Sequence, residues 1–276
     1  MDYLSKKKRW LLSSIALFIG IFHLIPFYIL LTTSLKERGD FSSKWTFPST
    51  YSFENFTSAW ETANLGTAFI NTVIITFFSA VLLILFSSMA AYPLARFQTR
   101  INNFVYMLLV AVMVIPPLTA LVSLYQLVVD LGMMNTHAIA ILNNVAAYTP
   151  LAVFLYTGFI RSTIPKELEE AAKIDGAGHL RIFFTIVFPL LKPVTASILI
   201  ISCVYIWNDY QFAIFFLQAE EVRTLTVALS SFFGQNASRL NLVAAAAILA
   251  VIPMVILFLV LQKHFVKGLA SGSIKG

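Results

Sequence analysis

Residues 165–178 read PKELEEAAKIDGAG and form a polar stretch between two long apolar runs. The leading proline suits the first turn of a helix, because its missing N–H would have no partner there anyway. Glu167, Glu169 and Glu170 follow at the positive end of the helix dipole. Gly176 favours an end to the helix and a reversal of the chain. The stretch therefore predicts a short helix that lies outside the membrane, between two spans.

The composition around this stretch is that of a membrane protein. Hydrophobic residues make up 59% of the 276 and charged residues 12%, whereas soluble domains carry about 25% charged residues. Long apolar runs predict six membrane-spanning helices, each able to cross about 30 Å of hydrocarbon. They are expected at residues 10–33, 68–95, 104–129, 138–160, 194–217 and 242–261. We therefore expect an all-α, polytopic membrane protein whose transmembrane domain covers residues 10–264.

The positions of lysine and arginine predict the orientation of the chain. With the N-terminus inside, fourteen of the 19 lysine and arginine residues lie in inner segments and five in outer loops. Such an excess marks the cytoplasmic side, and it accounts for the net charge of +6 without a nucleic-acid partner. We expect a cytoplasmic basic tail at residues 1–9, a cytoplasmic segment at 165–189 and a cytoplasmic C-terminal tail at 265–276.

One face of the predicted polar helix is narrow and made mostly of small residues. Leu168, Ala171, Ala172 and Asp175 recur at helical spacing, so they share this face. Small side chains suit a helix that seats closely on another protein. The alternative is a capped loop helix whose charges are solvated.

A wider pattern includes this helix. Glu170-Ala-Ala172, Gly176 and the run Ile186-Val-Phe-Pro189 resemble the cytoplasmic EAA signature of ATP-driven, binding-protein-dependent importers. The usual ending of that signature is Ile-x-Leu-Pro, and Phe188 replaces its leucine here. Three further stretches are similar to the smaller permease subunit of maltose-type carbohydrate importers: Asn71-Thr72, Trp207-Asn208-Asp209 and the tail from Gly268 to Gly276.

The resemblance implies a six-helix permease core in a bacterial inner membrane, with no catalytic site and no cofactor of its own. Besides membrane lipid, it implies a paralogous permease, two cytoplasmic ATPases that bind the ATP, an external solute-binding protein and a sugar, with oligosaccharide as the family expectation. The loop at residues 218–241 resembles the outer loop through which the family contacts its binding protein.

The resemblance also assigns residues to the contact with the ATPase. The EAA helix, acting as a coupling helix, would make this contact through Leu168, Glu170, Ala171, Ala172, Asp175 and Gly176. The C-terminal tail would reach the ATPase dimer interface with Gly268, Ser271, Gly272 and Lys275.

A carboxylate within the fifth predicted span indicates a second candidate site. Asp209 would lie about 22 Å along that helix, where a carboxylate is costly unless it faces water or a polar partner. We therefore place it toward a translocation path or a partner permease, together with the nearby Tyr205, Trp207 and Asn208 and with Asn71 of the second span. Aromatic and planar hydrogen-bonding groups suit a sugar, and a contact between subunits is the equally open alternative.

The sequence also limits the source of energy. It contains no Gly-x-x-x-x-Gly-Lys-Ser/Thr phosphate-binding loop, so any ATP that drives transport binds a separate chain or domain. The alternative is a secondary carrier driven by protons through Asp209, although the spans hold few other ionisable residues. The metal and nucleophile motifs His-Glu-x-x-His and Gly-x-Ser-x-Gly are absent, and the single cysteine, Cys203, excludes an internal disulfide. We therefore expect a non-catalytic transport subunit.

Overall fold

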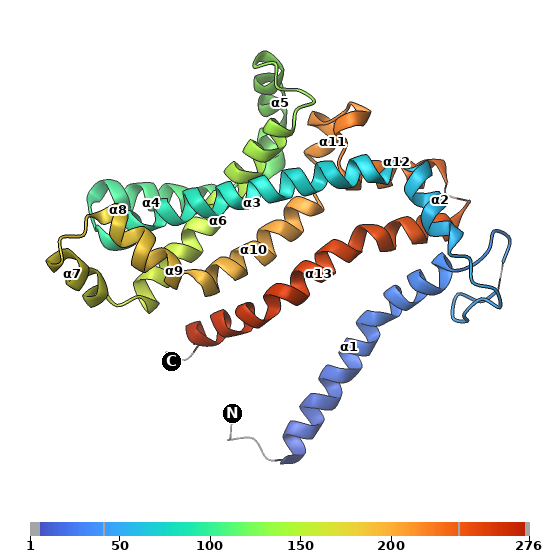
Figure 1. Ribbon diagram of the computed structural model, residues 1–276, viewed down its shortest axis with the longest axis horizontal. Coiled ribbons are helices and arrows are strands. Elements are labelled where there is room, and N and C mark those ends of the chain that lie inside the picture. Colours follow the sequence, from blue (N-terminus) through green and yellow to red (C-terminus); the bar gives the residue numbers. More distant parts are fainter. Residues whose placement is uncertain (1–5, 41, 237, 274–276) are drawn as a thin grey trace. The chain divides into compact units, whose positions relative to one another are not determined.

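The computed structural model describes residues 6–40, 42–236 and 238–273, and within them the side chains of residues 7–262. The described residues form helices and connecting turns without a strand, which confirms the all-α fold (Figure 1). Four helices are long and apolar enough to cross a membrane, and six spans result if each of two bent helix pairs counts as one. The chain divides into two compact units, which are described in turn.

The first unit contains residues up to Gly66 and Ala228–Ile252. It holds α1 (Lys6–Ser34), α2 (Glu54–Thr62), most of α12 (Leu225–Gln235) and the first part of α13 (Leu240–Ser273). Asn55 of α2 ties these elements together. Its Nδ2 donates to the carbonyls of Ser34 and Lys36, both at 2.8 Å, and its Oδ1 accepts from Asn241 at 2.9 Å. The end of α1 is thereby fixed to the start of α13.

The second unit contains Thr67–Val227 and the rest of α13. It begins with α3 (Leu65–Arg96), α4 (Arg100–Val112), the 3₁₀ turn η1 (Pro117–Ala120), α5 (Leu121–Asp130) and α6 (His137–Thr163). One span was expected at residues 104–129, and within it α4 meets η1 and α5 at an angle of 96°. Pro116 is extended, with ψ at 127°, and Pro117 has no N–H to continue the helix. The two prolines therefore bend this span.

The second half of this unit begins outside the long helices. It contains α7 (Lys166–Ile174), α8 (His179–Ile182), the π-helical turn η2 (Phe183–Val187), α9 (Phe188–Leu190), α10 (Lys192–Trp207), α11 (Ala213–Phe216) and the 3₁₀ turn η3 (Glu220–Val222). The segment from α8 to α9 meets α10 at 71°. The helix expected at residues 194–217 is shorter than predicted, because α10 ends at Trp207. Asn208 accounts for this end, since its side chain donates to the Val204 carbonyl at 2.8 Å and so competes with the helix ladder.

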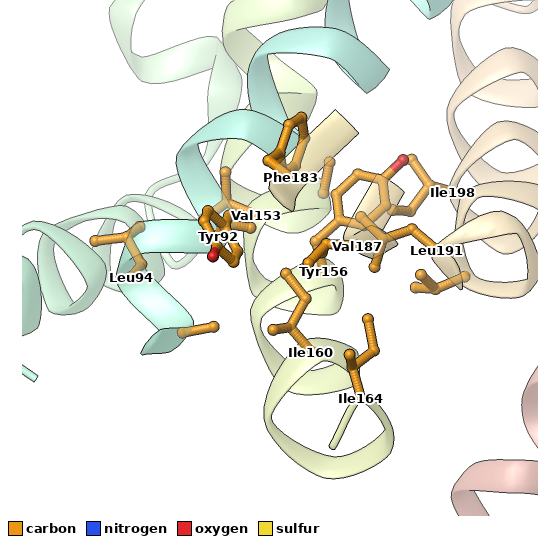
Figure 2. Packing of buried hydrophobic residues seen from close by; sticks show 14 of the residues in the cluster. Tyr92, Leu94, Val153, Tyr156, Ile160, Ile164, Phe183, Val187, Leu191 and Ile198 are labelled. Carbon is orange, nitrogen blue, oxygen red and sulfur yellow. The ribbon is translucent and has the colours of Figure 1, made fainter. Parts of the chain in front are cut away.

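A buried apolar cluster lies between α3, α6 and the segment that follows α7. Tyr156 and Ile160 of α6 belong to it, as does Ile164 just after that helix, with Val187 and Leu191 of the following segment (Figure 2). Ala172 and Ala177 pack against this cluster from α7 and the turn after it. Close packing of this kind holds membrane helices together where lipid offers no hydrophobic drive. The cluster therefore packs against the inner side of α7 and the turn after it.

The C-terminal tail continues α13 as far as Ser273. Gly268, Ser271 and Gly272 of the expected C-terminal tail thus belong to this helix. The side chains of this stretch, and the whole of Lys275, lie outside the described residues, so their expected place at an ATPase interface stays a prediction.

Candidate functional site

The helix expected from the polar stretch is α7, and its C-terminal end follows the predicted glycine signal. Gly176 has a φ of +78°, in the left-handed region that glycine adopts without strain. Its N–H donates to the Lys173 carbonyl at 3.0 Å, and the Ala177 N–H donates to the Ala172 carbonyl at 2.9 Å. These two bonds form a Schellman motif, which satisfies the last carbonyls of the helix. The chain then reverses into α8.

The residues expected to share a docking face on α7 divide between two faces. Leu168 is 46% exposed, and Glu170, Ala171, Asp175 and Gly176 are exposed as well. Ala172 is half-buried against the apolar cluster, so it lies at the edge of the outward face, and its expected contact with the ATPase stays a prediction. The physical reason for its partial burial is the rotation of α7, which turns positions 169 and 172, one helical turn apart, toward the interior.

Two exposed apolar side chains enlarge the outward surface. Ile174 at the end of α7 is 87% exposed, and Leu180 in α8 is 67% exposed. The sequence analysis did not single them out, although an aliphatic residue at the end of a polar helix is a usable signal. The surface formed by Leu168, Glu170, Ala171, Ile174, Asp175, Gly176 and Leu180 is called the α7 surface below.

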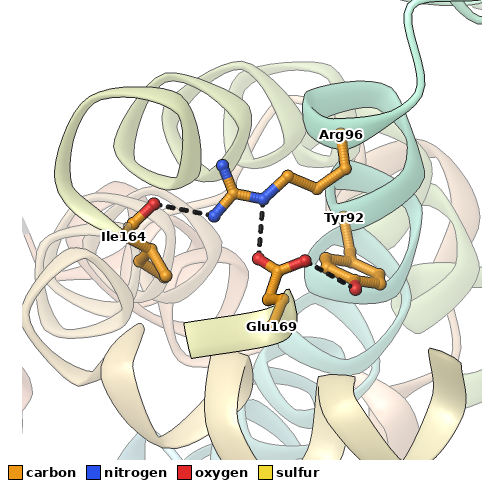
Figure 3. Close-up of polar contacts among 4 residues, drawn as sticks. All are labelled: Tyr92, Arg96, Ile164 and Glu169. Atoms are coloured by element: carbon orange, nitrogen blue, oxygen red, sulfur yellow. Dashed lines mark hydrogen bonds and ion pairs between the residues drawn. The ribbon is translucent and has the colours of Figure 1, made fainter. Parts of the chain in front are cut away.

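Glu169 lies on the opposite side of α7 and is only 4% exposed. Its Oε1 accepts from Arg96 Nε at 2.7 Å, and its Oε2 accepts from the Tyr92 hydroxyl at 2.9 Å (Figure 3). Arg96 Nη2 also donates to the Ile164 carbonyl at the end of α6, at 2.7 Å. The four residues form a buried joint between α7, α3 and α6. Sequence reasoning missed this joint, because it grouped Glu169 with two solvated glutamates of the first turn.

A second arginine holds the same end of α3 without touching α7. Arg161 of α6 donates from Nη2 to the Leu94 carbonyl at 2.8 Å. Its guanidinium also lies over the Tyr106 ring of α4, 5.0 Å from the ring centroid. This arginine therefore ties α6 to α3 and α4, and it provides a natural comparison for Arg96.

The residues expected at a translocation path have different surroundings. Tyr205 is 61% exposed and stacks on Tyr148 of α6, with ring centroids 6.0 Å apart and an interplanar angle of 25°. Asn208 is exposed and Asp209 is half-buried nearby. Trp207 is only 4% exposed and packs edge-on against Phe69, so it is a packing residue and does not face a path. Tyr148 is the residue that sequence reasoning missed here.

The expected position of Asp209 within a continuous helix is wrong. It follows the end of α10, where its Oδ1 accepts from the Phe212 N–H at 3.1 Å. Its carbonyl accepts from the Thr226 hydroxyl at 2.7 Å. The first bond is that of a turn-forming aspartate, and the second connects the end of α10 to the first turn of α12.

Asn71 is also buried, and it does not face a path. Its Nδ2 donates to the carbonyls of Glu221 and Arg223 at 2.9 and 3.0 Å, and its Oδ1 lies 2.9 Å from His137 Nε2. The neighbouring Thr72 accepts from the Leu225 N–H at 2.8 Å. These bonds attach the segment around η3 to the beginning of α3. That segment is the first part of the loop at residues 218–241.

The bent spans, the short α7 and its turn define a class of protein, the membrane subunits of transport systems, and comparison with known proteins agrees. Residues 83–271 match the family described as the binding-protein-dependent transport system inner membrane component. The chain is 66% identical over 270 residues to the melibiose/raffinose/stachyose import permease protein MelC of Bacillus subtilis (strain 168). The matched region covers 98% of each chain. It is 32% identical to the probable starch degradation products transport system permease protein AmyC of Thermoanaerobacterium thermosulfurigenes, over 97% of each.

A solved structure has the same fold. It is a bacterial ABC transporter involved in the import of the acidic polysaccharide alginate, with a TM-score of 0.79 and 23% identity over 96% of this chain and all of that one.

The chain therefore belongs to the binding-protein-dependent transport system inner membrane component family. It is a permease subunit of an ABC transporter, a multi-pass protein of a bacterial inner membrane, and it is not an enzyme. The resemblance based on the EAA signature is confirmed. The proton-coupled alternative finds no support in these relatives.

Proposed function

We propose that the chain is one permease subunit of an ATP-driven importer of oligosaccharides of the melibiose, raffinose and stachyose series. The observation that carries the proposal is the 66% identity to MelC, which extends over 98% of both chains. Identity at that level over the full length supports a shared substrate class. More distant relatives named for starch products and arabinooligosaccharides support an oligosaccharide.

The proposed assembly contains a paralogous permease, two ATPases and an external binding protein. The chain itself has no phosphate-binding loop in its sequence, which supports a separate ATPase that binds the ATP. A second alginate ABC transporter structure, with a TM-score of 0.67, is in complex with a periplasmic protein bound to an alginate pentasaccharide. The shared fold supports a place for such a binding protein next to this chain as well.

The proposed contact with the ATPase is the α7 surface on the cytoplasmic side, with both termini of the chain on that side. Small residues let the helix seat closely, and Ile174 and Leu180 offer apolar area that water would otherwise cover. Movement of the ATPases would then tilt the spans attached to α7. The tail from Gly268 is proposed to reach the ATPase interface.

The proposed path surface is the stacked pair Tyr148 and Tyr205, with Asn208 and Asp209 beside it. Sugars have apolar faces and hydroxyl edges, so flat aromatic rings next to an amide and a carboxylate suit them. Trp207 and Asn71 are buried inside the unit and are not part of the proposed path surface.

Uptake of labelled raffinose tests the proposal. Cells from which this gene is deleted should lose raffinose and melibiose uptake but keep maltose uptake, and a plasmid copy should restore the loss. The purified chain alone in liposomes should move no raffinose, with or without a proton gradient. Undiminished raffinose uptake in the deletion strain would refute the proposed substrate class. Gradient-driven uptake by the isolated chain, abolished in Asp209→Asn, would refute the ATP-driven class.

A further inference from the structure

We propose that the buried ion pair of Arg96 and Glu169 is the mechanical joint through which α7 moves α3, so that both are positioning residues for transport. The proposal rests on the proposed function, because it assigns the route by which work from an ATPase enters the spans. It concerns the inner side of α7, opposite the α7 surface.

The first support is the burial pattern of α7. Among its nine residues, Glu169 is the one with a buried side chain. Ala172 is half-buried and has only a methyl group to offer as a contact. A force applied to the α7 surface therefore has one strong side-chain route into the rest of the unit, and that route is the Glu169 carboxylate.

The second support is the nature of the two chain connections of α7. After the helix the chain passes through Gly176 and Gly178, which are both open to solvent, and a glycine turn transmits force poorly. Before the helix the chain passes Ile164, whose carbonyl is held by Arg96. The guanidinium that binds Glu169 thus also fixes the residue that leads into α7.

The third support is the chemistry of the joint. The Arg96 and Glu169 side chains are 6% and 5% exposed. Buried ion pairs can be replaced by apolar residues of similar volume without loss of stability, because desolvation offsets much of the attraction. Apolar packing, however, does not fix the orientation of one helix relative to the other. Both Glu169 oxygens accept bonds from α3, at 2.7 and 2.9 Å, and this fixes the roll of α7 as well as its distance from α3.

The joint acts at the end of a long helix, whose last turn contains Pro93. Arg96 is the last residue of α3, a helix of 32 residues, and Tyr92 lies one turn before it on the same face. Such a helix is about 48 Å long. A displacement at the joint is thus delivered along α3 toward Asn71 and Thr72, which hold the η3 segment.

The test separates transmission of force from simple stability. The variant Arg96→Met/Glu169→Leu replaces the pair by apolar side chains of similar volume. The control Arg161→Met removes the other arginine at this end of α3, which binds Leu94 and Tyr106 but no residue of α7. Each transporter is purified as the full complex through a tag on this chain and placed in proteoliposomes with its binding protein. The quantity measured is ATP hydrolysed per raffinose imported.

We expect the variant Arg96→Met/Glu169→Leu, called the apolar pair, to assemble into the full complex in normal amounts and to hydrolyse ATP. Its ratio of ATP to raffinose should rise at least about fivefold, the lower end of typical coupling effects. The charge exchange Arg96→Glu/Glu169→Arg should bring the ratio back toward that of the unmodified protein, and Arg161→Met should leave it unchanged. An unchanged ratio in the apolar pair, or an equal rise in Arg161→Met, would overturn the proposal.

A second measurement does not depend on the sugar. Spin labels at Lys173 of α7, which is exposed and lies outside the α7 surface, and at the exposed Ala90 of α3, with Cys203 replaced by serine, report the distance between the two helices. We expect a narrow distance distribution in the unmodified complex and a broad one in the apolar pair. A narrow distribution in both would overturn the joint. If the unmodified complex imports no raffinose, the proposed substrate is wrong, and the spin labels still decide on the joint.

Discussion

The two ends of α3 hold short segments by different chemistry. At one end a carboxylate and a guanidinium, both buried, join Glu169 of α7 to Arg96. Toward the other end the neutral side chains of Asn71 and Thr72 hold the segment around η3 through backbone groups. In Figure 1, α7 lies near one end of α3 and α11, which precedes η3, lies toward the other.

The two attachments therefore differ in how much free energy is needed to break them. Charge-assisted bonds are about twice as strong as neutral ones, and a buried charge cannot leave its partner without a large penalty. A neutral hydrogen bond contributes about 1 kcal/mol net, because water replaces it at little cost. We infer that α7 stays attached to α3 throughout a transport cycle, whereas the η3 segment is able to detach.

Removal of one member of the ion pair should have the largest effect. In Arg96→Met the Glu169 carboxylate stays buried without its partner, which costs about 3–5 kcal/mol. We expect a lower unfolding temperature of the purified complex and little chain in the membrane fraction. The control is the Arg96→Met/Glu169→Leu pair, which should restore most of the lost protein. Equal abundance of Arg96→Met and the unmodified chain would show that the carboxylate is not buried in the assembled transporter.

Tyr92→Phe should have the next largest effect, because it removes one of the bonds to the carboxylate and leaves the ion pair in place. A hydrogen bond to a charged group contributes about 1.5–3 kcal/mol. We expect a moderate fall in unfolding temperature, smaller than that of Arg96→Met. Tyr106→Phe is the matched control, since the hydroxyl of Tyr106 plays no part in the contact of its ring with Arg161. If both tyrosine variants have the same unfolding temperature, the hydrogen bond from the Tyr92 hydroxyl to Glu169 does not add to stability.

Asn71→Ala tests the neutral attachment. It leaves the Glu221 and Arg223 carbonyls without their side-chain donor, at a cost of about 1–3 kcal/mol if they stay buried. We expect slower raffinose uptake with an unchanged ratio of ATP to raffinose, because the joint at the other end is intact. Asn103→Ala, at an exposed position in α4, is the control. A rise in that ratio for Asn71→Ala would remove the proposed contrast between the two ends.

Gly176→Val should have the smallest effect on stability. The site has open space, so the cost arises from the positive φ and amounts to about 1–2 kcal/mol. The strain falls on the turn that ends α7, so we expect lower raffinose uptake with a nearly normal amount of chain. Gly178→Ala is the matched control, because Gly178 has a φ of −74° and equally open space. Equal uptake by Gly176→Val and Gly178→Ala would show that the shape of this turn does not matter.

Local signals predicted the parts of the site that depend on local structure. The proline before α7 and the glycine after it indicated both ends of the helix, and the structure has α7 at Lys166–Ile174. The apolar runs predicted where the chain is membrane-spanning, because each span must be apolar over its own length. The two prolines indicated a kink, but the apolar runs did not predict its size, 96°, since an apolar run is equally apolar whether straight or bent.

The sequence by itself thus determined the membrane class, the family and the position of α7, since apolar length, a leading proline and a left-handed glycine act over a few residues. Only the tertiary structure decided which of three neighbouring glutamates is buried, and that Trp207 and Asn71 face inward. The partners that decide these points are distant in the chain: Arg96 lies 73 residues before Glu169, and Leu225 lies 153 residues after Thr72. Helical periodicity restricts which residues share a face, but the rotation of that face follows from what the rest of the chain brings against it.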